Sequence, residues 1–482
     1  MLETILKWIE FIPFFIIMCS ISIGIFFVVF EISNLVMFIN TFLGILFTII
    51  YLFVFKDSLM FKKNFFFHFD IYSIFFAILI LLTSLITSFF VHFYYKKNKM
   101  YKKEYYIILL ALSLGSLSLN FSKHMSVFFV SMEIITLSTV GLIYFFNNNK
   151  KAIEASLKYI LFSSFSSIFV LFGIGLIYFI SGSLEYSNLY NFVDNSDIYK
   201  KIFLFFGLWM ILSGIFFKMS IFPFHFIFPD VYKISNPVFL ICFSVLNKIS
   251  FFSFLLYVFT NTFLSKETFF LNLIEIFSFF SMCFGNLLAN LQNNIKRLLG
   301  YASISQVGYL MLILLVFDKF VFFKENIFFY FLNYIICNIC IFSAMTIVKK
   351  YYIKNNMYNN IYKENIFFNL YNSFPLLSIA LSIVFFSLSG IPFTIGFISK
   401  LYLIYSIIEN KLWFLMIGLI FSSIIGVYLY FKIIIDFYNK KYDLFFIKKY
   451  DISMSSKILE KIIFFISSLL IIINILFLNI RY

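Results

Sequence analysis

The chain has 482 residues, of which 62% are hydrophobic and 12% are charged, and its mean hydropathy is +0.99. A soluble globule of this length has too little interior to bury so much apolar surface, so the composition predicts a protein that crosses the membrane many times. A net charge of +15 would suggest nucleic acid as the partner of a soluble protein. Here the lysines lie mainly between apolar segments, where membrane orientation and lipid headgroups account for them, so no nucleic acid is expected.

Apolar segments of about twenty residues, the length that crosses a bilayer as a helix, follow one another along the chain. The links between them are short, except for polar stretches near 182–199, 349–372 and 439–457, so no folded domain is expected outside the membrane. The predicted fold class is an all-α polytopic membrane protein. Its expected spans, about fourteen, are 11–31, 35–55, 71–95, 104–121, 126–146, 153–181, 200–227, 236–260, 268–289, 298–316, 326–348, 373–408, 412–438 and 458–478.

Positive charge differs between the two sets of loops. The loops after odd-numbered spans contain about twice as many Lys and Arg residues as those after even-numbered spans. Because the more basic side of a membrane protein faces inward, this asymmetry predicts that both termini lie on the outer side. The N-terminal sequence MLETILKWIE leads into a full-length span and not into a cleavage site, so no cleavable targeting segment is expected.

Two spans are interrupted in mid-membrane. Pro223 follows Lys218 in the seventh span, and Gly390 and Pro392 precede Lys400 in the twelfth. Breaks at membrane depth are tolerated where the freed backbone lines a cavity, and breaks in corresponding places indicate an internal repeat. We therefore expect two inverted five-helix repeats, helices 4–8 and 9–13, with helices 7 and 12 broken. The predicted parts are an N-terminal three-helix segment (1–100), the first repeat (101–262), the second repeat (263–440) and a C-terminal loop with the last helix (441–482).

Four ionisable residues lie deep in the predicted spans: Glu133, Lys218, Lys248 and Lys400. A charge at the centre of a membrane helix costs roughly 2.5–3.5 kcal/mol, so each needs a partner or water. Glu133 is the carboxylate deep enough to interact with Lys218, and its movement toward or away from Lys218 would change the affinity of that lysine for a proton. The two residues predict a proton switch, with a static ion pair between helices as the alternative.

Lys248 and Lys400 have no predicted partner inside the membrane. Both lie about half a span from either end, which favours hydrated proton-relay sites over side chains that snorkel to an interface. His225 follows the Pro223 break by two residues and is expected to pass protons between Lys218 and Lys248. The alternative for His225 is a satisfied core histidine or a residue at a helix end.

Sequence motifs for nucleotide binding or for redox cofactors are absent. It contains no phosphate-binding loop, no dinucleotide fingerprint, no cysteine cluster for iron and sulfur, and no paired histidines for haem. Cys337 and Cys340 form a CxxC pattern inside an apolar span without a second pair, which is typical of small core residues. We expect neither a cofactor nor a metal in this chain.

Four segments resemble a known family: ASLKYILFSSFSSIFVLFGIGLIYFISGS (155–183), FKMSIFPFHFIFPDVYKISNPV (217–238), NLQNNIKRLLGYASISQVGYL (290–310) and SLSGIPFTIGFISKLYL (387–403). They are similar to NADH dehydrogenase subunit 2, the antiporter-like membrane subunit of respiratory complex I, which is related to Mrp sodium/proton antiporter subunits. The likeness spans about residues 100–440. It implies fourteen helices, two inverted five-helix repeats and broken helices 7 and 12.

The resemblance also implies roles for the buried charges. By motif position, Glu133 resembles the family's helix 5 glutamate, Lys218 its helix 7 lysine, Lys248 its helix 8 lysine and Lys400 its terminal helix 12 lysine. A lysine at the last position favours subunit 2 over subunit 4, which carries a glutamate there. Gln306 in SISQVGYL departs from several members that have histidine, which puts a relay through an ionisable group at that position in doubt.

The implied function is that of a proton-translocating membrane-arm subunit of complex I (NADH:ubiquinone oxidoreductase), driven by quinone reduction in other subunits. NADH, FMN, iron-sulfur clusters and ubiquinone are then expected in other subunits, and the expected partners are an adjacent antiporter-like subunit, small membrane subunits and lipids. Two alternatives stay open: a stand-alone Mrp-type cation/proton antiporter subunit, and a mainly structural membrane subunit. The 78 Phe and 32 Tyr residues are typical of an AT-rich genome and favour the mitochondrial inner membrane.

Overall fold

The computed structural model describes residues 9–60, 66–95, 103–146, 150–186, 198–262, 267–316, 323–354, 366–439 and 454–481. These residues form helices and no strand, apart from isolated β-bridges between Phe67 and Ser122 and between His124 and Glu185. A helix occupies each predicted span, which confirms the all-α polytopic fold class. Eleven helices in the described residues are long and apolar enough to cross a membrane. The predicted polar stretches lie partly outside the described residues, at 187–197, 355–365 and 440–453.

The chain forms two compact units. Unit 1 comprises Met1–Ser220 and Ile234–Leu271, and unit 2 comprises Ile221–Lys233 and Asn272–Tyr482. The four-part division predicted from the sequence stays a prediction. In unit 1 the helices are η1 (Ile9–Phe11), α2 (Ile12–Val29), α3 (Asn34–Val54), α4 (Lys56–Met60), α5 (Ile71–Tyr95), α6 (Glu104–Asn120), α7 (Met125–Phe146), α8 (Lys150–Ser181), α10 (Ile198–Met219) and α12 (Pro237–Asn261).

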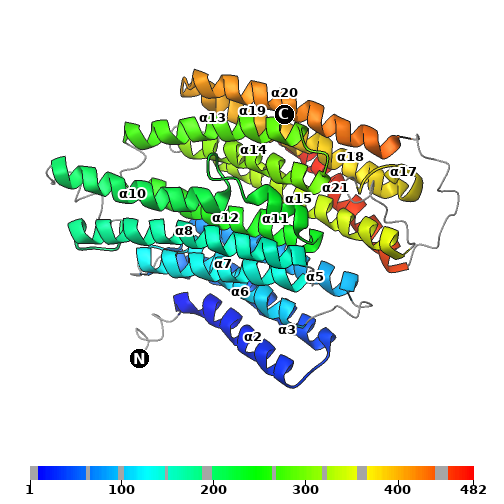
Figure 1. Cartoon of the computed structure of the whole chain (residues 1–482), viewed down its shortest axis with the longest axis horizontal. Helices are drawn as coiled ribbons and strands as arrows, with labels where there is room; N and C mark the ends of the chain where they lie inside the picture. Colours follow the sequence, from blue (N-terminus) through cyan, green and yellow to red (C-terminus); the bar gives the residue numbers. More distant parts are fainter. Residues whose placement is uncertain are drawn as a thin grey trace. The chain divides into compact units, whose positions relative to one another are not determined.

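Helix α12 forms the centre of unit 1. All its residues from Pro237 to Phe259 are buried, because α5, α6, α7 and α10 pack against it. Helix α8 packs against α7 and α10, and α2 and α3 lie side by side at the blue end of the chain (Figure 1). A helix that is apolar on all sides is expected at the middle of a bundle, which places Lys248 of α12 in the interior of this unit.

Helices α14 (Ile295–Leu315) and α15 (Phe323–Lys354) are the most buried spans of unit 2 among the described residues. Helix α15 packs against α18, α19 and α21, while α14 contacts α15, α19 and α20. The order of these helices along the chain, from green to red, can be followed in Figure 1. The helices that follow α12 are α13 (Thr268–Asn290), α14 (Ile295–Leu315), α15 (Phe323–Lys354), α17 (Leu370–Ser373), α18 (Pro375–Ser389), α19 (Ile395–Glu409), α20 (Trp413–Tyr438) and α21 (Met454–Arg481).

The first predicted interruption is present but begins earlier than expected. Helix α10 ends at Met219, whereas the predicted span continued to residue 227. Ser220 has a φ of +64°, and Pro223 follows a cis peptide bond and has no N–H to continue the helix. The chain then runs through turns to the short α11 (Phe228–Ile234). The apolar residues of this segment extend the hydropathy signal past the break, which is why the pattern overestimated the helix.

The second predicted interruption separates α18 from α19. Gly390 ends α18 with a φ of +80°, a left-handed conformation that glycine adopts without a steric penalty. Ser387 donates a hydrogen bond to the side-chain oxygen of Asn333 on α15 at 2.5 Å, and it accepts one from the N–H of Gly396 at 3.3 Å. These bonds satisfy polar groups that the break would otherwise leave unpaired in hydrocarbon.

The two interruptions occupy equivalent places in two sets of five spans. The first set is α6, α7, α8, the broken α10–α11 and α12, and the second is α13, α14, α15, the broken α18–α19 and α20. In both sets the fourth span is the broken one. An odd number of spans in each set is what the predicted inverted repeat requires.

Helices α8 and α10 approach closely at two glycines. A Cβ atom on Gly173 would lie 2.5 Å from the carbonyl oxygen of Gly207, and one on Gly207 would lie 3.0 Å from that of Gly173. Small residues at such crossings let membrane helices approach backbone to backbone. The crossing fixes the position of α10, whose last turn carries Lys218.

Substitution of Gly173 by alanine should therefore destabilise unit 1. The added methyl group overpacks the crossing, at a cost of about 1–3 kcal/mol. Gly175, two residues away on the exposed side of α8, has no atom within 4 Å of the corresponding Cβ position, so Gly175→Ala is the matched control. We expect a lower thermal-unfolding midpoint of the detergent-solubilised protein for Gly173→Ala only. Equal midpoints for the two variants would contradict the close crossing.

Candidate functional site

Glu133 lies near the middle of α7, and one of its two carboxylate oxygens accepts a hydrogen bond. Thr136, one turn further along the helix, donates its hydroxyl to the Glu133 backbone carbonyl at 2.8 Å and to Oε2 at 3.1 Å. The other carboxylate oxygen, Oε1, is buried and has no hydrogen-bond partner among the described residues. A buried acceptor without a donor is costly, so this oxygen is suited to accept a hydrogen bond from a water molecule.

Lys218 lies in the last turn of α10 and is 2% exposed. Its Nζ is buried without a hydrogen-bond partner in the described part of the chain. Glu133 is the charged group that interacts electrostatically with this ammonium. No ion pair of 4.0 Å or shorter joins the two side chains, so the static pair considered as an alternative is not formed in this structure.

Tyr159 on α8 completes the surroundings of Glu133, and the sequence reasoning missed it. It is 1% exposed, forms a side-chain hydrogen bond with Thr139 and lies within electrostatic range of Glu133. Its ring packs edge-to-face on Phe243 of α12, with centroids 5.6 Å apart. A tyrosine within an apolar span is a weak signal in this sequence, because 32 residues of the chain are tyrosine.

Lys248 is 0% exposed, about halfway along α12. Its ammonium therefore does not reach the protein surface, contrary to what snorkelling would require. The side-chain oxygen of the preceding Asn247 is also buried and has no hydrogen-bond partner among the described residues. The middle of unit 1 thus contains strongly polar groups in a helix with no exposed face.

His225 lies in the interruption after α10 and is 5% exposed. Its ring stacks on Phe222 and Phe226, with centroids 5.4 and 4.8 Å away, and its Nδ1 has no hydrogen-bond partner in the described residues. His225 belongs to unit 2, whereas Lys218 and Lys248 belong to unit 1. Proton passage through His225 between these lysines stays a prediction.

Lys400 lies in the second turn of α19, beside the second interruption. Its Nζ donates a hydrogen bond to the backbone carbonyl of Ser389, the last residue of α18, at 2.7 Å. The same nitrogen lies 5.6 Å from the ring centroid of Tyr309 on α14. The Tyr309 hydroxyl in turn donates to Ser422 of α20 at 2.9 Å. Three helices of unit 2 therefore contribute to the surroundings of Lys400.

Gln306, the position that departs from the family, is hydrogen-bonded to a buried tyrosine. Tyr330 donates its hydroxyl to both the side-chain and the backbone oxygen of Gln306, each at 2.8 Å. Tyr430 of α20 lies close to the same side chain. The Gln306 side-chain oxygen is thus satisfied within unit 2 and joins α14 to α15, although the amide is not ionisable.

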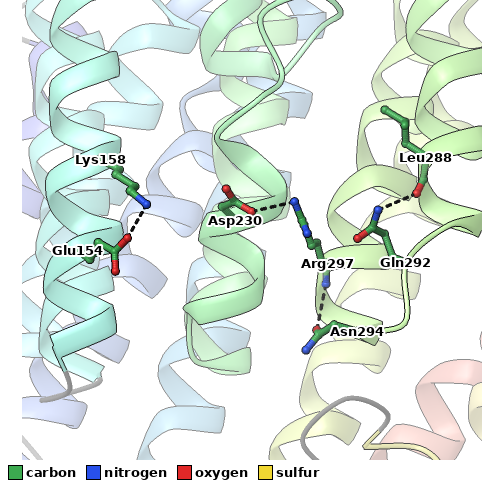
Figure 2. A network of polar contacts seen from close by, with 7 residues as sticks. All are labelled: Glu154, Lys158, Asp230, Leu288, Gln292, Asn294 and Arg297. Carbon is green, nitrogen blue, oxygen red and sulfur yellow. Dashed lines mark hydrogen bonds and ion pairs between the residues drawn. The ribbon is translucent and has the colours of Figure 1, made fainter.

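Ion pairs lie toward helix ends, away from these buried groups. Arg297 of α14 pairs with Asp230 of α11 at 3.3 Å, and its backbone N–H donates to the capping Asn294 (Figure 2). Glu154 and Lys158 pair one turn apart on the exposed surface of α8 (Figure 2). The Asp230 side chain is half exposed. Exposed pairs of this kind contribute little to stability.

The structure brings together some of the five predicted site residues. Glu133 and Lys218 are electrostatic partners within unit 1, which also contains Lys248. His225 and Lys400 belong to unit 2. Sequence reasoning missed the uncharged partners, whose polar character is ordinary in a chain this rich in Ser, Asn and Tyr: Tyr159, Asn286, Tyr309, Tyr330, Asn333, Ser387, Ser389 and Ser422.

Comparisons with known proteins identify a family that this chain matches and a relative within it. The family model described as NADH:quinone oxidoreductase/Mrp antiporter, TM, matches residues 122–426. NADH-quinone oxidoreductase subunit N of Buchnera aphidicola subsp. Acyrthosiphon pisum (strain APS) is 35% identical over 433 residues, which cover 88% of this chain and 87% of the relative. The matched region contains all five predicted site residues.

Two solved structures share the fold. A chain of respiratory complex I from Thermus thermophilus with bound aureothin superposes with a TM-score of 0.76 at 21% identity, covering 96% of this chain and 97% of that one. A chain of the Mrp complex from Dietzia sp. DQ12-45-1b superposes with a TM-score of 0.80 at 16% identity, covering 97% and 94%. At these identities the likeness concerns the fold alone.

Replacement of Lys218 by methionine tests whether this buried charge stabilises the protein. Because its Nζ has no hydrogen-bond partner among the described residues, an apolar side chain of similar length should remove a desolvation cost of roughly 2.5–3.5 kcal/mol and lose only the electrostatic interaction with Glu133. We expect the thermal-unfolding midpoint of Lys218→Met to equal or exceed that of the wild type. A clear fall in the midpoint would instead assign Lys218 a structural role.

Proposed function

Because the chain belongs to the NADH:quinone oxidoreductase/Mrp antiporter family, we propose that it is the antiporter-like, proton-translocating membrane subunit of an NADH:quinone oxidoreductase. The support is the relative named NADH-quinone oxidoreductase subunit N, which matches over 87% of its own length, together with the shared fold of a complex I chain. Its partners are then other subunits of the membrane arm. A subunit with this function stores and moves protons inside the membrane.

The observation that carries the proposal is the buried Lys218 ammonium within electrostatic range of Glu133. Neither Nζ nor Oε1 has a hydrogen-bond partner among the described residues, yet the two charges interact electrostatically. A change in their separation changes how strongly Lys218 holds a proton, because the carboxylate stabilises the charged lysine while burial opposes it. Lys248 and Lys400 are the proposed further stations of the relay, and His225 is the proposed connection near the first break.

The energy for this transfer is proposed to come from other subunits. NADH, FMN, iron-sulfur clusters and ubiquinone are assigned there, and this chain is assigned no cofactor.

The exposed apolar side chains of this chain are suited to contact lipid tails or neighbouring membrane subunits. On α8 these are Leu157, Leu161, Phe165, Ile168, Phe169 and Phe172, and on α20 they are Ile417, Ile420, Phe421, Ile424 and Tyr428.

The membrane that holds this multi-pass protein is proposed to be an energy-transducing inner membrane. The composition favoured the mitochondrial inner membrane with both termini on its outer side, and both remain predictions. The relatives are bacterial, which supports the inner membrane of a bacterium equally well. An AT-rich genome accounts for the composition in either case.

A stand-alone cation/proton antiporter subunit is the second candidate. The shared fold of the Mrp complex chain supports it, but the likeness there is 16% in sequence. The 35% identity to a subunit of NADH-quinone oxidoreductase favours the first candidate. A mainly structural subunit would have no use for buried charges that cost stability.

Native electrophoresis of solubilised membranes, followed by mass spectrometry of the band that oxidises NADH, tests membership of the complex. We expect this chain in that band, because a membrane-arm subunit is held by the other subunits. Its appearance only as a monomer or small oligomer would overturn the proposal. Cation and proton exchange in vesicles would then be the decisive assay.

Glu133→Gln and Lys218→Ala test the proton relay. Each should lower proton pumping coupled to NADH oxidation by about tenfold or more while the complex still assembles, since a relay that loses a proton-transfer group loses rates of this order. Lys158→Ala is the matched control, because this lysine lies on the exposed surface of α8. Full pumping in both test variants would count against the relay.

A further inference from the structure

We propose that the charged form of Lys400 is held in a cation site that contains no carboxylate. The site is built from the end of α18, the ring of Tyr309 and the backbone at Gly390, and it makes Gly390 and Tyr309 positioning residues for Lys400. The inference deepens the proposed function, on which the relay role of Lys400 rests. Its geometry lies entirely within unit 2.

The end of α18 supplies the direct acceptor. The final carbonyl groups of a helix have no N–H partner within the helix and carry the negative end of its dipole. The interruption after Ser389 exposes these carbonyls at membrane depth, and the Lys400 ammonium donates to that of Ser389 at 2.7 Å. The break thus gives a cation a charge-assisted hydrogen bond where a continuous helix would offer none.

Tyr309 supplies the second element. The Lys400 nitrogen lies 5.6 Å from its ring centroid, within the range in which the face of an aromatic ring attracts a cation. The ring is 1% exposed, and its orientation is fixed because the hydroxyl donates to Ser422 at 2.9 Å and contacts the Asn286 amide at 3.5 Å. Asn286 also donates to the Ser422 carbonyl at 2.7 Å.

Gly390 makes room for the lysine side chain. A Cβ atom at this position would lie 2.7 Å from Cδ of Lys400, closer than Cβ contacts in proteins, and 3.2 Å from its Nζ, so the flexible end of the lysine would have to shift. The φ of +80° is independently unfavourable for any other residue. Gly390 therefore ends α18 and at the same time lets Lys400 lie against the backbone of the break.

The absence of a carboxylate has a chemical consequence. Lys400 forms no ion pair in the described part of the chain. When the ammonium releases its proton, it leaves behind neutral dipoles and a ring, and no buried anion remains uncompensated. A lysine held in this way is suited to take up and release protons without a partner that must move away.

A double-mutant cycle in the assembled complex tests the proposal. Proton pumping is compared for wild type, Gly390→Ala, Lys400→Ala and the double variant, with Gly175→Ala as the control glycine in open space. We expect Gly390→Ala to lower pumping by a factor at least about twofold larger when Lys400 is present than when it is absent, because the strain of a side chain at a φ of +80° acts in both backgrounds and the contact with Lys400 in only one. An equal factor in the two backgrounds would identify a purely structural defect and would overturn the proposal.

The outcomes also separate this proposal from the proposed function. If Lys400→Ala lowers pumping and Gly390→Ala does not, the cation site is wrong and the relay stands. If Lys400→Ala pumps normally, Lys400 is not a relay station, and electron cryo-microscopy of the Gly390→Ala complex then decides the cation site. A distance from Nζ to the Ser389 oxygen beyond about 3.5 Å supports it, and an unchanged distance overturns it.

Two substitutions at Tyr309 keep the proposal testable if Gly390→Ala fails to assemble. Tyr309→Phe keeps the aromatic face and removes only the hydroxyl, so pumping should stay within about twofold of the wild type, whereas Tyr309→Leu removes the face and should lower pumping further. In the Lys400→Ala background the two variants should pump equally. Equal pumping by the two variants with Lys400 present would overturn the role of the ring.

Discussion

Polar groups inside hydrocarbon must find partners within the protein, and this requirement governs where the chain places its lysines and its broken helices. Each interruption frees backbone groups, and a lysine lies near each one: the buried Lys218 in the turn before the first, and the partly buried Lys400 in the second turn of the helix that follows the second. At the second break the freed carbonyl of Ser389 accepts a hydrogen bond from Lys400, whereas at the first break the Lys218 ammonium has no hydrogen-bond partner among the described residues.

The two units satisfy this requirement by different chemistry. In unit 1 a carboxylate, Glu133, acts on Lys218 at a distance, and both groups keep atoms without hydrogen-bond partners. In unit 2 the Lys400 ammonium is bound directly by the carbonyl of Ser389. In the first arrangement, a change in the distance between Glu133 and Lys218 changes their electrostatic interaction. In the second, the Lys400 ammonium is held by a direct hydrogen bond. A proton relay through both would use one lysine that responds to helix movement and one that is held in a fixed position.

Close helix packing keeps these arrangements in position. The crossing at Gly173 and Gly207 sets α10 against α8, and Gly390 lets a lysine lie against bare backbone. In a membrane, apolar contact with lipid does not favour one helix arrangement over another. The close fit of the backbones at such glycines therefore does much to determine which helices pack together. The numerous phenylalanines fill the remaining surface, many of them exposed on the outer helices.

The sequence by itself determined the fold class, the spans, both interruptions and the charged members of the site, because hydropathy and the cost of buried charge are local properties of the chain. It overestimated the seventh span, where apolar residues continue past Met219 into turns. Only the tertiary structure showed that Glu133 and Lys218 interact without forming an ion pair, and that Ser389 and Tyr309 surround Lys400. Those partners are neutral residues from separate helices. The chain contains many tyrosines, serines and backbone carbonyls, and the sequence pattern does not indicate which of them will lie next to a lysine once the helices have packed.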